Sequence, residues 1–234
     1  MYRLVTVIAL SGALVACSGP ASLPEGGEGA APVASTAPAS DPAPVMGPER
    51  RILAVGDSLL AGYGLASTNE AYPARLEAAL RARGINARVI NAGVSGDTSS
   101  AGAERFGFVL KSQSARPDLV IVEFGGNDVL RAVPPEQTRA NLERMLSEAK
   151  AAGLPVLLMG MLAPPNLGPE FKAKFEPIYP ALAKRYGARL VPFFLAPVIG
   201  KPDLVQADHI HPTAQGVDEI VAATVGEVAK ALPK

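Results

Sequence analysis

The chain has 234 residues, which is enough for one sizeable domain with some residues to spare. It carries 22 basic and 22 acidic residues, so no global electrostatic field favours a nucleic acid as its partner. The single cysteine excludes an intramolecular disulfide and a thiolate metal cluster, and two histidines are too few for us to expect a catalytic zinc. We therefore expect a chain that uses no metal or other cofactor and binds no nucleic acid.

Residues 1–16 are predicted to form a lipoprotein signal peptide. A short positive start precedes a run of apolar or small residues from 4 to 14, which is too short for a mature spanning helix. The tetrad Leu14-Val15-Ala16-Cys17 resembles a bacterial lipobox, in which the cysteine becomes the lipid-modified first residue of the mature chain. An ordinary signal peptide with an incidental cysteine is the alternative. We expect Cys17 to carry the lipid and to anchor the chain in the periplasm, and Ser18 favours the outer membrane.

Residues 17–48 are predicted to be the lipidated N-terminus and a disordered linker. Of the 31 residues from 18 to 48, 24 are Ala, Pro, Gly, Ser or Thr, and none is aromatic. Such a stretch cannot bury enough apolar surface to offset the entropy lost on ordering. As a coil it would span roughly 30 Å, which suits a tether. Residues 49–234 are the predicted domain, which we expect to be a monomer.

Strands and helices alternate along this domain. Strands are expected at 51–55, 87–91, 118–124, 155–162 and 188–194, and helices at 72–83, 98–110, 135–152, 169–186 and 213–231. Five strand–helix repeats predict an α/β fold with a parallel sheet between two layers of helices, a three-layer αβα arrangement. Right-handed crossovers favour the flavodoxin-like strand order.

Ser58 is the first candidate for chemistry. It follows a buried strand in the run Gly56-Asp57-Ser58, although Asp57 and Ser58 could also simply cap the turn. Three further polar motifs follow predicted strands or precede the last helix: 93–97, 125–128 and 208–212. Because ligands meet parallel sheets at the carboxyl ends of the strands, we expect all four motifs to converge on one edge.

A serine nucleophile needs a base, and the base needs a group that fixes its tautomer. Only His209 and His211 are available as bases. Asp208 stands three residues before His211, a spacing that lets the carboxylate fold back onto the imidazole. We therefore predict His211 as the base, Asp208 as its partner and His209 as a bystander. A histidine base predicts a rate that rises from about pH 6 to pH 8.

Acyl transfer also needs hydrogen-bond donors where negative charge develops on oxygen. The candidates are the backbone N–H of Gly96, the side-chain amide of Asn127 and the N–H of Ser58 itself. Taken singly, Gly96 and Asn127 have an alternative interpretation as turn residues. Their joint occurrence with Ser58 and with the Asp208/His211 pair favours an oxyanion site.

The four motifs together resemble the four blocks of the SGNH (GDSL) hydrolases. They read Gly56-Asp57-Ser58-Leu59, Gly96, Gly125-Gly126-Asn127-Asp128 and Asp208-x-x-His211. The resemblance covers about residues 50–232 and is closest to the periplasmic multifunctional thioesterase/lysophospholipase and arylesterase branch. It implies the SGNH hydrolase fold and the same roles as above for Ser58, Gly96, Asn127, Asp208 and His211. The departures are His209, where the family often has glycine, and the lipobox with its linker. No Gly-x-Ser-x-Gly run surrounds Ser58, so a standard α/β-hydrolase is not expected.

The expected function is therefore metal-free hydrolysis of carboxylic esters and acyl thioesters through an acyl-enzyme. The resemblance implies lysophospholipids, fatty acyl esters, acyl thioesters and aryl esters as substrates. Candidates for the acyl pocket are Leu59, Pro164, Pro165 and Ile210, for which core packing is an equal alternative. Three other functions stay open: a carbohydrate O-acetylesterase, an inactive tethered binding module, and a flavodoxin-like nucleotide-binding protein.

Overall fold

A computed structural model describes residues 45–233. Its five strands are β1 (Met46–Gly56), β2 (Ile85–Gly93), β3 (Leu119–Glu123), β4 (Val156–Met159) and β5 (Arg189–Val191). They form one sheet in the order β2-β1-β3-β4-β5, and every neighbouring pair is parallel. The predicted five-stranded flavodoxin-like sheet is confirmed. All five residues of β3 are buried, which explains why this central strand reads as an apolar run.

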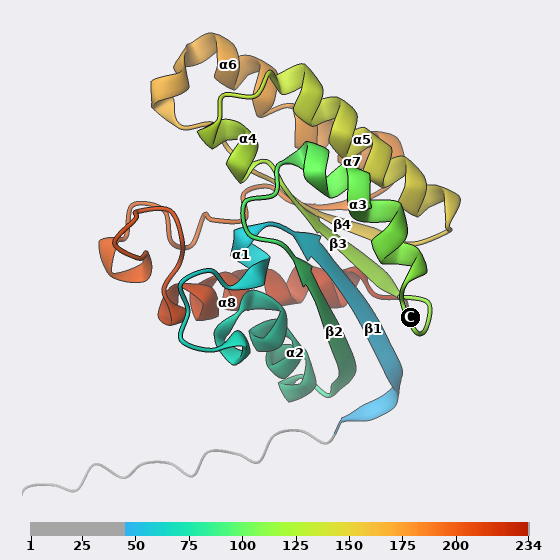
Figure 1. The fold of residues 1–234 in the computed structure, drawn as a ribbon. Coiled ribbons are helices and arrows are strands. Elements are labelled where there is room, and N and C mark those ends of the chain that lie inside the picture. The colour runs from blue at the N-terminus through green and yellow to red at the C-terminus, as the bar shows by residue number, and fades with distance from the viewer. Residues whose placement is uncertain (1–44, 234) are drawn as a thin grey trace, which may run out of the picture. The chain divides into compact units, whose positions relative to one another are not determined.

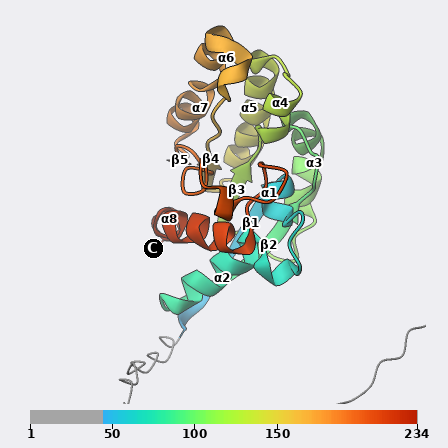
Figure 2. The same cartoon turned by 90° about the vertical axis from the view of Figure 1, so that its left-hand side faces the viewer.

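Helices cover both faces of the sheet (Figures 1 and 2). One layer contains α2 (Tyr72–Ala82) and α8 (Ala214–Ala231), and the other contains α3 (Ser99–Lys111), α5 (Pro135–Ala151) and α7 (Ile178–Tyr186). This is the expected three-layer αβα arrangement. Among residues 45–233, no helix combines the length and the apolar character that a membrane crossing requires.

The first strand starts earlier than the sequence predicts. β1 begins at Met46, whose N–H donates to the carbonyl of Gly84 at 3.1 Å, and Met46 pairs in register with Ile85. Residues 46–48 are therefore part of a strand, whereas composition alone assigns them to the linker. The predicted signal peptide, Cys17 and the linker up to residue 44 lie outside the described residues.

The helix predicted over 169–186 is in fact two helices, α6 (Gly168–Phe175) and α7. Pro177 separates them because it has no N–H to donate and its ring crowds the preceding turn. The break lets both helices contribute to the core, since Phe175 and Tyr179 are both buried. The strands predicted at 155–162 and 188–194 are also too long, because the chain leaves the sheet after Met159 and Val191.

Five short helices in residues 45–233 are not predicted from the sequence, because each is too short to show a hydrophobic repeat. They are α1 (Ser58–Ala61), α4 (Gly126–Leu130), η1 (Thr68–Glu70), η2 (Pro165–Leu167) and η3 (Pro202–Leu204). α1 begins directly beyond the carboxyl end of β1, and α4 begins beyond that of β3. These two short helices carry residues of the predicted site.

Replacing Gly125 by alanine is expected to lower the free energy of unfolding by about 2–4 kcal/mol. Gly125 has a φ of +119°, and a Cβ there would overlap the hydroxyl of Tyr179. That hydroxyl is buried and donates to the carbonyl of Phe124 at 3.0 Å, so it cannot move away cheaply. Urea denaturation measures the loss. Gly187→Ala is the matched control, because Gly187 has a φ of +68° but nothing within 4 Å. Equal losses for the two variants would contradict the packing argument.

Candidate active site

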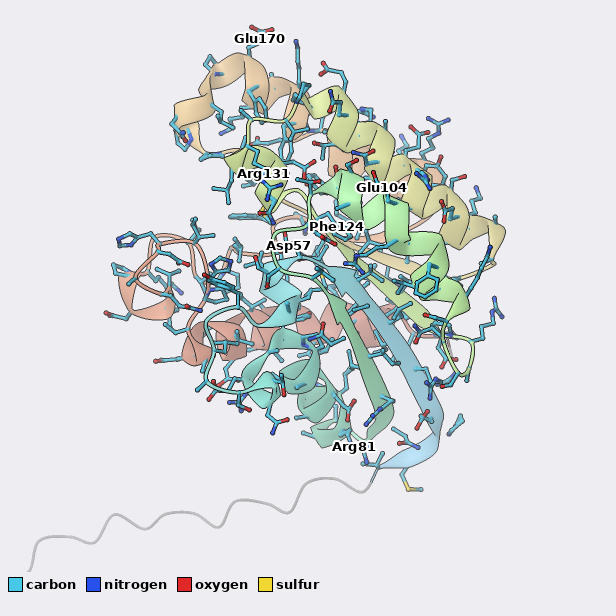
Figure 3. All side chains as sticks on the ribbon, viewed as in Figure 1. Asp57, Arg81, Glu104, Phe124, Arg131 and Glu170 are labelled. Atoms are coloured by element: carbon cyan, nitrogen blue, oxygen red, sulfur yellow. The ribbon has the colours of Figure 1, made fainter. Side chains whose placement is uncertain are left out.

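One cavity of about 960 Å³ is lined by residues from all four polar motifs. Ser58, Gly96, Asn127 and His211 all line it. It lies where β1 and β3 end, beside the labelled side chain of Asp57 in Figure 3. The motifs thus meet at one edge of the sheet, as the strand–helix alternation predicts.

Ser58, His211 and Asp208 form one chain of hydrogen bonds. Ser58 is the first residue of α1, and its Oγ lies 2.8 Å from His211 Nε2. His211 Nδ1 lies 2.6 Å from Asp208 Oδ2. A carboxylate partner keeps the proton on Nδ1, which leaves Nε2 free to accept the serine proton. The turn is fixed by Asp57, whose Oδ1 accepts the N–H of Leu59 at 3.0 Å.

The carboxylate of Asp208 is ionised at every pH relevant to activity. Its Oδ1 accepts the backbone N–H of Ile210 at 2.9 Å and that of His211 at 3.0 Å. Desolvation acts to raise the pKa of Asp208. The hydrogen bonds from the His211 side chain and from the two backbone N–H groups outweigh it and lower the pKa to about 2. The group therefore stays charged and continues to orient the imidazole well below neutral pH.

The loop that carries Asp208 and His211 is closed on itself. Val205 and Pro212 form an antiparallel bridge, and the N–H of Gln206 donates to the carbonyl of His211 at 2.7 Å. The Gln206 side chain donates to the carbonyls of Tyr63 at 2.8 Å and Pro212 at 2.9 Å. The Tyr63 ring packs against His211, with 4.6 Å between ring centroids. No spacing in the sequence indicates Gln206 or Tyr63 as supports of the base.

His209 lies at the same cavity but takes no part in this chain. Its backbone N–H donates to the carbonyl of Gln206 at 2.9 Å, and its φ is +59°. That left-handed conformation favours glycine, so a histidine is an unusual residue at this position. The structure thus brings His211, and not His209, to Ser58.

Two arginines, Arg131 and Arg105, fix the loop that contains Gly96. Its carbonyl accepts from Arg131 at 2.9 Å, and it has a φ of +87°. Arg105 connects the same loop to β1, because it donates to Asp97 at 2.7 Å and to the carbonyl of Gly56 at 2.9 Å. Arg131, which follows the last residue of α4, is labelled in Figure 3.

Asn127 is oriented by Asp57. Its Nδ2 donates to Asp57 Oδ2 at 3.1 Å, which leaves the second amide hydrogen for another acceptor. The next residue, Asp128, is buried and accepts from the backbone N–H of Ser99 at 2.8 Å and from Thr138 at 2.9 Å. Asp128 therefore fixes α4 to its neighbours and does not face the cavity.

The candidate pocket residues all line the cavity: Leu59, Pro164, Pro165 and Ile210. Leu59 also belongs to the core, being only 6% exposed. The chain after β5 adds apolar lining that the sequence does not single out: Phe193, Leu195, Val198 and Ile199. The cavity wall is thus largely apolar around a small polar centre. No group of three or more His, Cys, Asp or Glu within residues 45–233 is arranged to hold a metal ion.

A hydroxyl, an imidazole and a carboxylate in one chain of hydrogen bonds are the machinery of acyl transfer by serine. At the strand ends of a flavodoxin-like sheet, they define the chain as a serine hydrolase. Residues 54–218 match the GDSL-like Lipase/Acylhydrolase family. The chain belongs to this family, as the four motifs predict.

Two relatives and one solved structure support this assignment to a family of hydrolases. The chain is 44% identical over 161 residues to "Esterase TesA" of Pseudomonas aeruginosa, covering 69% of this chain and 79% of that protein. It is 42% identical over 161 residues to "Thioesterase 1/protease 1/lysophospholipase L1" of Escherichia coli K12, covering 69% and 74%. The chain also resembles the crystal structure of AlinE4, an SGNH-hydrolase family esterase, with 59% sequence identity and a TM-score of 0.68. The match covers 81% of this chain and 100% of the AlinE4 chain.

Proposed function

We propose that the chain hydrolyses carboxylic esters and acyl thioesters through an acyl-enzyme on Ser58. The observation that carries this proposal is the chain of hydrogen bonds from Ser58 through His211 to Asp208 at the wall of an apolar cavity. The nucleophile, the base and the orienting acid are all in hydrogen-bonding contact.

Acylation begins when Ser58 Oγ attacks the carbonyl carbon of the substrate and its proton passes to His211 Nε2. The carbonyl oxygen becomes an oxyanion, which the N–H groups of Ser58 and Gly96 and the amide of Asn127 stabilise. The carbonyl–heteroatom bond then breaks, and His211 returns the proton to the leaving alkoxide or thiolate. Asp208 stays ionised throughout and stabilises the imidazolium.

Deacylation repeats these steps with water as the nucleophile. His211 takes a proton from water, the hydroxide attacks the acyl carbon, and the same three donors stabilise the second oxyanion. The bond to Ser58 Oγ breaks and the serine regains its proton from His211. The products are a carboxylic acid and an alcohol or thiol.

We infer that the acyl group is a medium or long chain. The cavity volume lies near the upper end of the roughly 300–1,000 Å³ range for ligand pockets, and most of its lining is apolar. The names of the relatives include thioesterase, esterase and lysophospholipase. Together these features support fatty acyl esters, lysophospholipids, aryl esters and acyl thioesters as substrates.

A series of p-nitrophenyl esters from acetate to palmitate tests this proposal, with Ser58→Ala assayed beside the wild type. A rate that peaks at medium or long chains and disappears in the variant supports it. A peak at acetate would instead support the carbohydrate O-acetylesterase. A folded protein that hydrolyses none of the esters, and no acyl-CoA or lysophospholipid, would contradict the proposal.

Asn127→Ala is expected to lower kcat by about 100-fold to 1,000-fold with a much smaller change in KM. The amide acts on the oxyanion, which exists only after the attack, so its loss affects the transition state more than substrate binding. Steady-state kinetics on the preferred ester measure the effect. Asn69→Ala, in η1 away from the cavity, is the control. If Asn127→Ala instead raised KM and left kcat unchanged, Asn127 would be assigned to substrate binding.

We further propose that Cys17 carries a lipid and anchors the enzyme in the periplasm, at the outer membrane. The lipobox-like tetrad, with Ser18 after it, supports this location. Cells fed a labelled fatty acid should label the wild-type protein, and Cys17→Ser should remove the label and move the enzyme to the soluble periplasmic fraction. The specific activity of the released enzyme should not change, because the site lies in residues 58–211. A label that persists in Cys17→Ser would contradict lipidation at this residue.

A further inference from the structure

We propose that Glu123 is a positioning residue of the active site, a neutral carboxylic acid that hydrogen-bonds the Asp57 carboxylate and so holds the Ser58 turn and the Asn127 amide in place. The inference rests on the proposed roles of Ser58 and Asn127. It goes beyond them because it assigns a proton and a function to a buried group that the mechanism does not use.

Glu123 is the last residue of β3 and lies next to the nucleophile turn. It pairs in register with Gly56 at the end of β1, and its Oε2 accepts the N–H of Asp57 at 3.3 Å. Glu123 is 0% exposed and Asp57 is 1% exposed. A Cβ on residue 56 would lie 2.8 Å from Glu123 Oε2. Glycine at position 56 therefore leaves the space that this carboxyl group occupies.

The hydrogen bonds place the negative charge on Asp57 and the proton on Glu123. Asp57 accepts the N–H of Leu59 and the amide of Asn127. Glu123 has only the N–H of Asp57, and its buried Oε1 has no hydrogen-bond partner among the residues that the structure describes. The contact between the Asp57 N–H and Glu123 Oε2 places the two buried residues side by side, so a proton on Glu123 could be donated to the Asp57 carboxylate. Burial, and then the charge of Asp57, raise the pKa of Glu123 well above its usual range.

Within residues 45–233, no lysine or arginine forms an ion pair with Asp57 or Glu123. Tyr72 from α2 and Tyr179 from α7 are both buried, and burial raises the pKa of each, so both hydroxyls stay neutral. On the α3 side, Arg105 donates to Asp97 and to the carbonyl of Gly56. On the side of the cavity, His211 interacts with Asp57, and in α4 Asp128 has its own donors from Ser99 and Thr138.

Loss of the Glu123 proton would therefore put a second negative charge directly behind the oxyanion donors. It would also remove the hydrogen bond that fixes Asp57. Both changes disfavour the oxyanion, so the rate should fall at alkaline pH in the wild type. Glutamine at position 123 has nearly the same shape, can still donate a hydrogen bond to Asp57 and cannot ionise.

The first experiment compares kcat and KM from about pH 5 to pH 10 for the wild type, Glu123→Gln and Glu123→Leu. Glu123→Gln should keep at least about a third of the wild-type kcat at neutral pH and lose the alkaline fall. Glu123→Leu fills the space without a donor, and should lower kcat on the order of 10-fold to 100-fold at neutral pH with KM little changed. Glu176→Gln is the control, because Glu176 also has a buried oxygen without a hydrogen bond but lies at the end of α6, where Lys172 is 3.7 Å from that oxygen.

Infrared difference spectroscopy tests the proton directly. The wild type and Glu176→Gln should show the carbonyl stretch of a neutral buried carboxylic acid at neutral pH, and Glu123→Gln should lack it. This readout needs no substrate, so it remains decisive even if the chain hydrolyses none of the assayed esters. The proposal is overturned if that band is absent from the wild type. It is equally overturned if folded Glu123→Gln keeps the alkaline fall, or is as slow as Glu123→Leu.

Discussion

Ser58→Ala is expected to lower kcat for ester hydrolysis on the order of 10⁵-fold to 10⁶-fold and to leave the fold intact. Among residues 45–233, Ser58 Oγ is the only hydroxyl that hydrogen-bonds His211 Nε2, at 2.8 Å, so no neighbouring side chain replaces the nucleophile. Its backbone N–H remains in the variant, as do Gly96 and Asn127. The donors and the cavity should therefore still support a small residual rate over the uncatalysed reaction.

Stopped-flow kinetics and labelling with a fluorophosphonate measure this effect. The wild type should form one covalent adduct per chain, and Ser58→Ala should form none. Ser147→Ala, on the exposed side of α5, is the matched control and should label fully. Covalent labelling of Ser58→Ala at the wild-type rate would show that the nucleophile is another residue.

His211→Ala is expected to lower kcat on the order of 10⁴-fold to 10⁶-fold, whereas His209→Ala should retain most of the activity. Only His211 contacts both Ser58 and Asp208. His209 is held by its backbone and makes no hydrogen bond to Ser58. The reverse order of the two variants would show that the base is misassigned.

The pH dependence of the rate distinguishes the base from the acid. The pKa of Asp208 is about 2, below the ordinary value for aspartate, so its hydrogen bonds favour the folded state above the ordinary pKa and are lost only as the pH falls through about 2. Asp208 therefore cannot cause the loss of rate that we expect between about pH 8 and pH 6, and a histidine base accounts for it. A rate that stays flat from about pH 5 to pH 9 would contradict a histidine base.

The sequence predicts the sheet well because each strand has its own apolar run and its own turn. It fails where the structure depends on distant partners. The start of β1 at Met46 depends on pairing with Ile85 and on the carbonyl of Gly84, neither of which composition reveals. The break between α6 and α7 could have been foreseen from Pro177, but the amphipathic pattern on both sides concealed it.

The candidate site is largely predictable because its residues stand in short motifs at the ends of strands. Ser58, Asp208 and His211 lie in hydrogen-bonding contact as the spacing suggests. The role of Glu123 is not predicted, because nothing in an otherwise apolar strand indicates that its last side chain contacts Asp57. Tyr63 and Gln206 are not predicted because the hydrogen bond between them joins residues that are 143 positions apart in the sequence.

The loop of residues 205–212 carries two of the three residues of the proposed triad, Asp208 and His211, while Ser58 lies 153 positions before His211 in the chain. A rigid displacement of this loop would keep the 2.6 Å contact between His211 and Asp208 and stretch only the 2.8 Å contact to Ser58. The distance between Ser58 Oγ and His211 Nε2 can therefore change while the pairing of His211 with Asp208 stays the same. Engineering can therefore tune serine reactivity through the anchors of this loop, such as Gln206, without altering the imidazole's own partner.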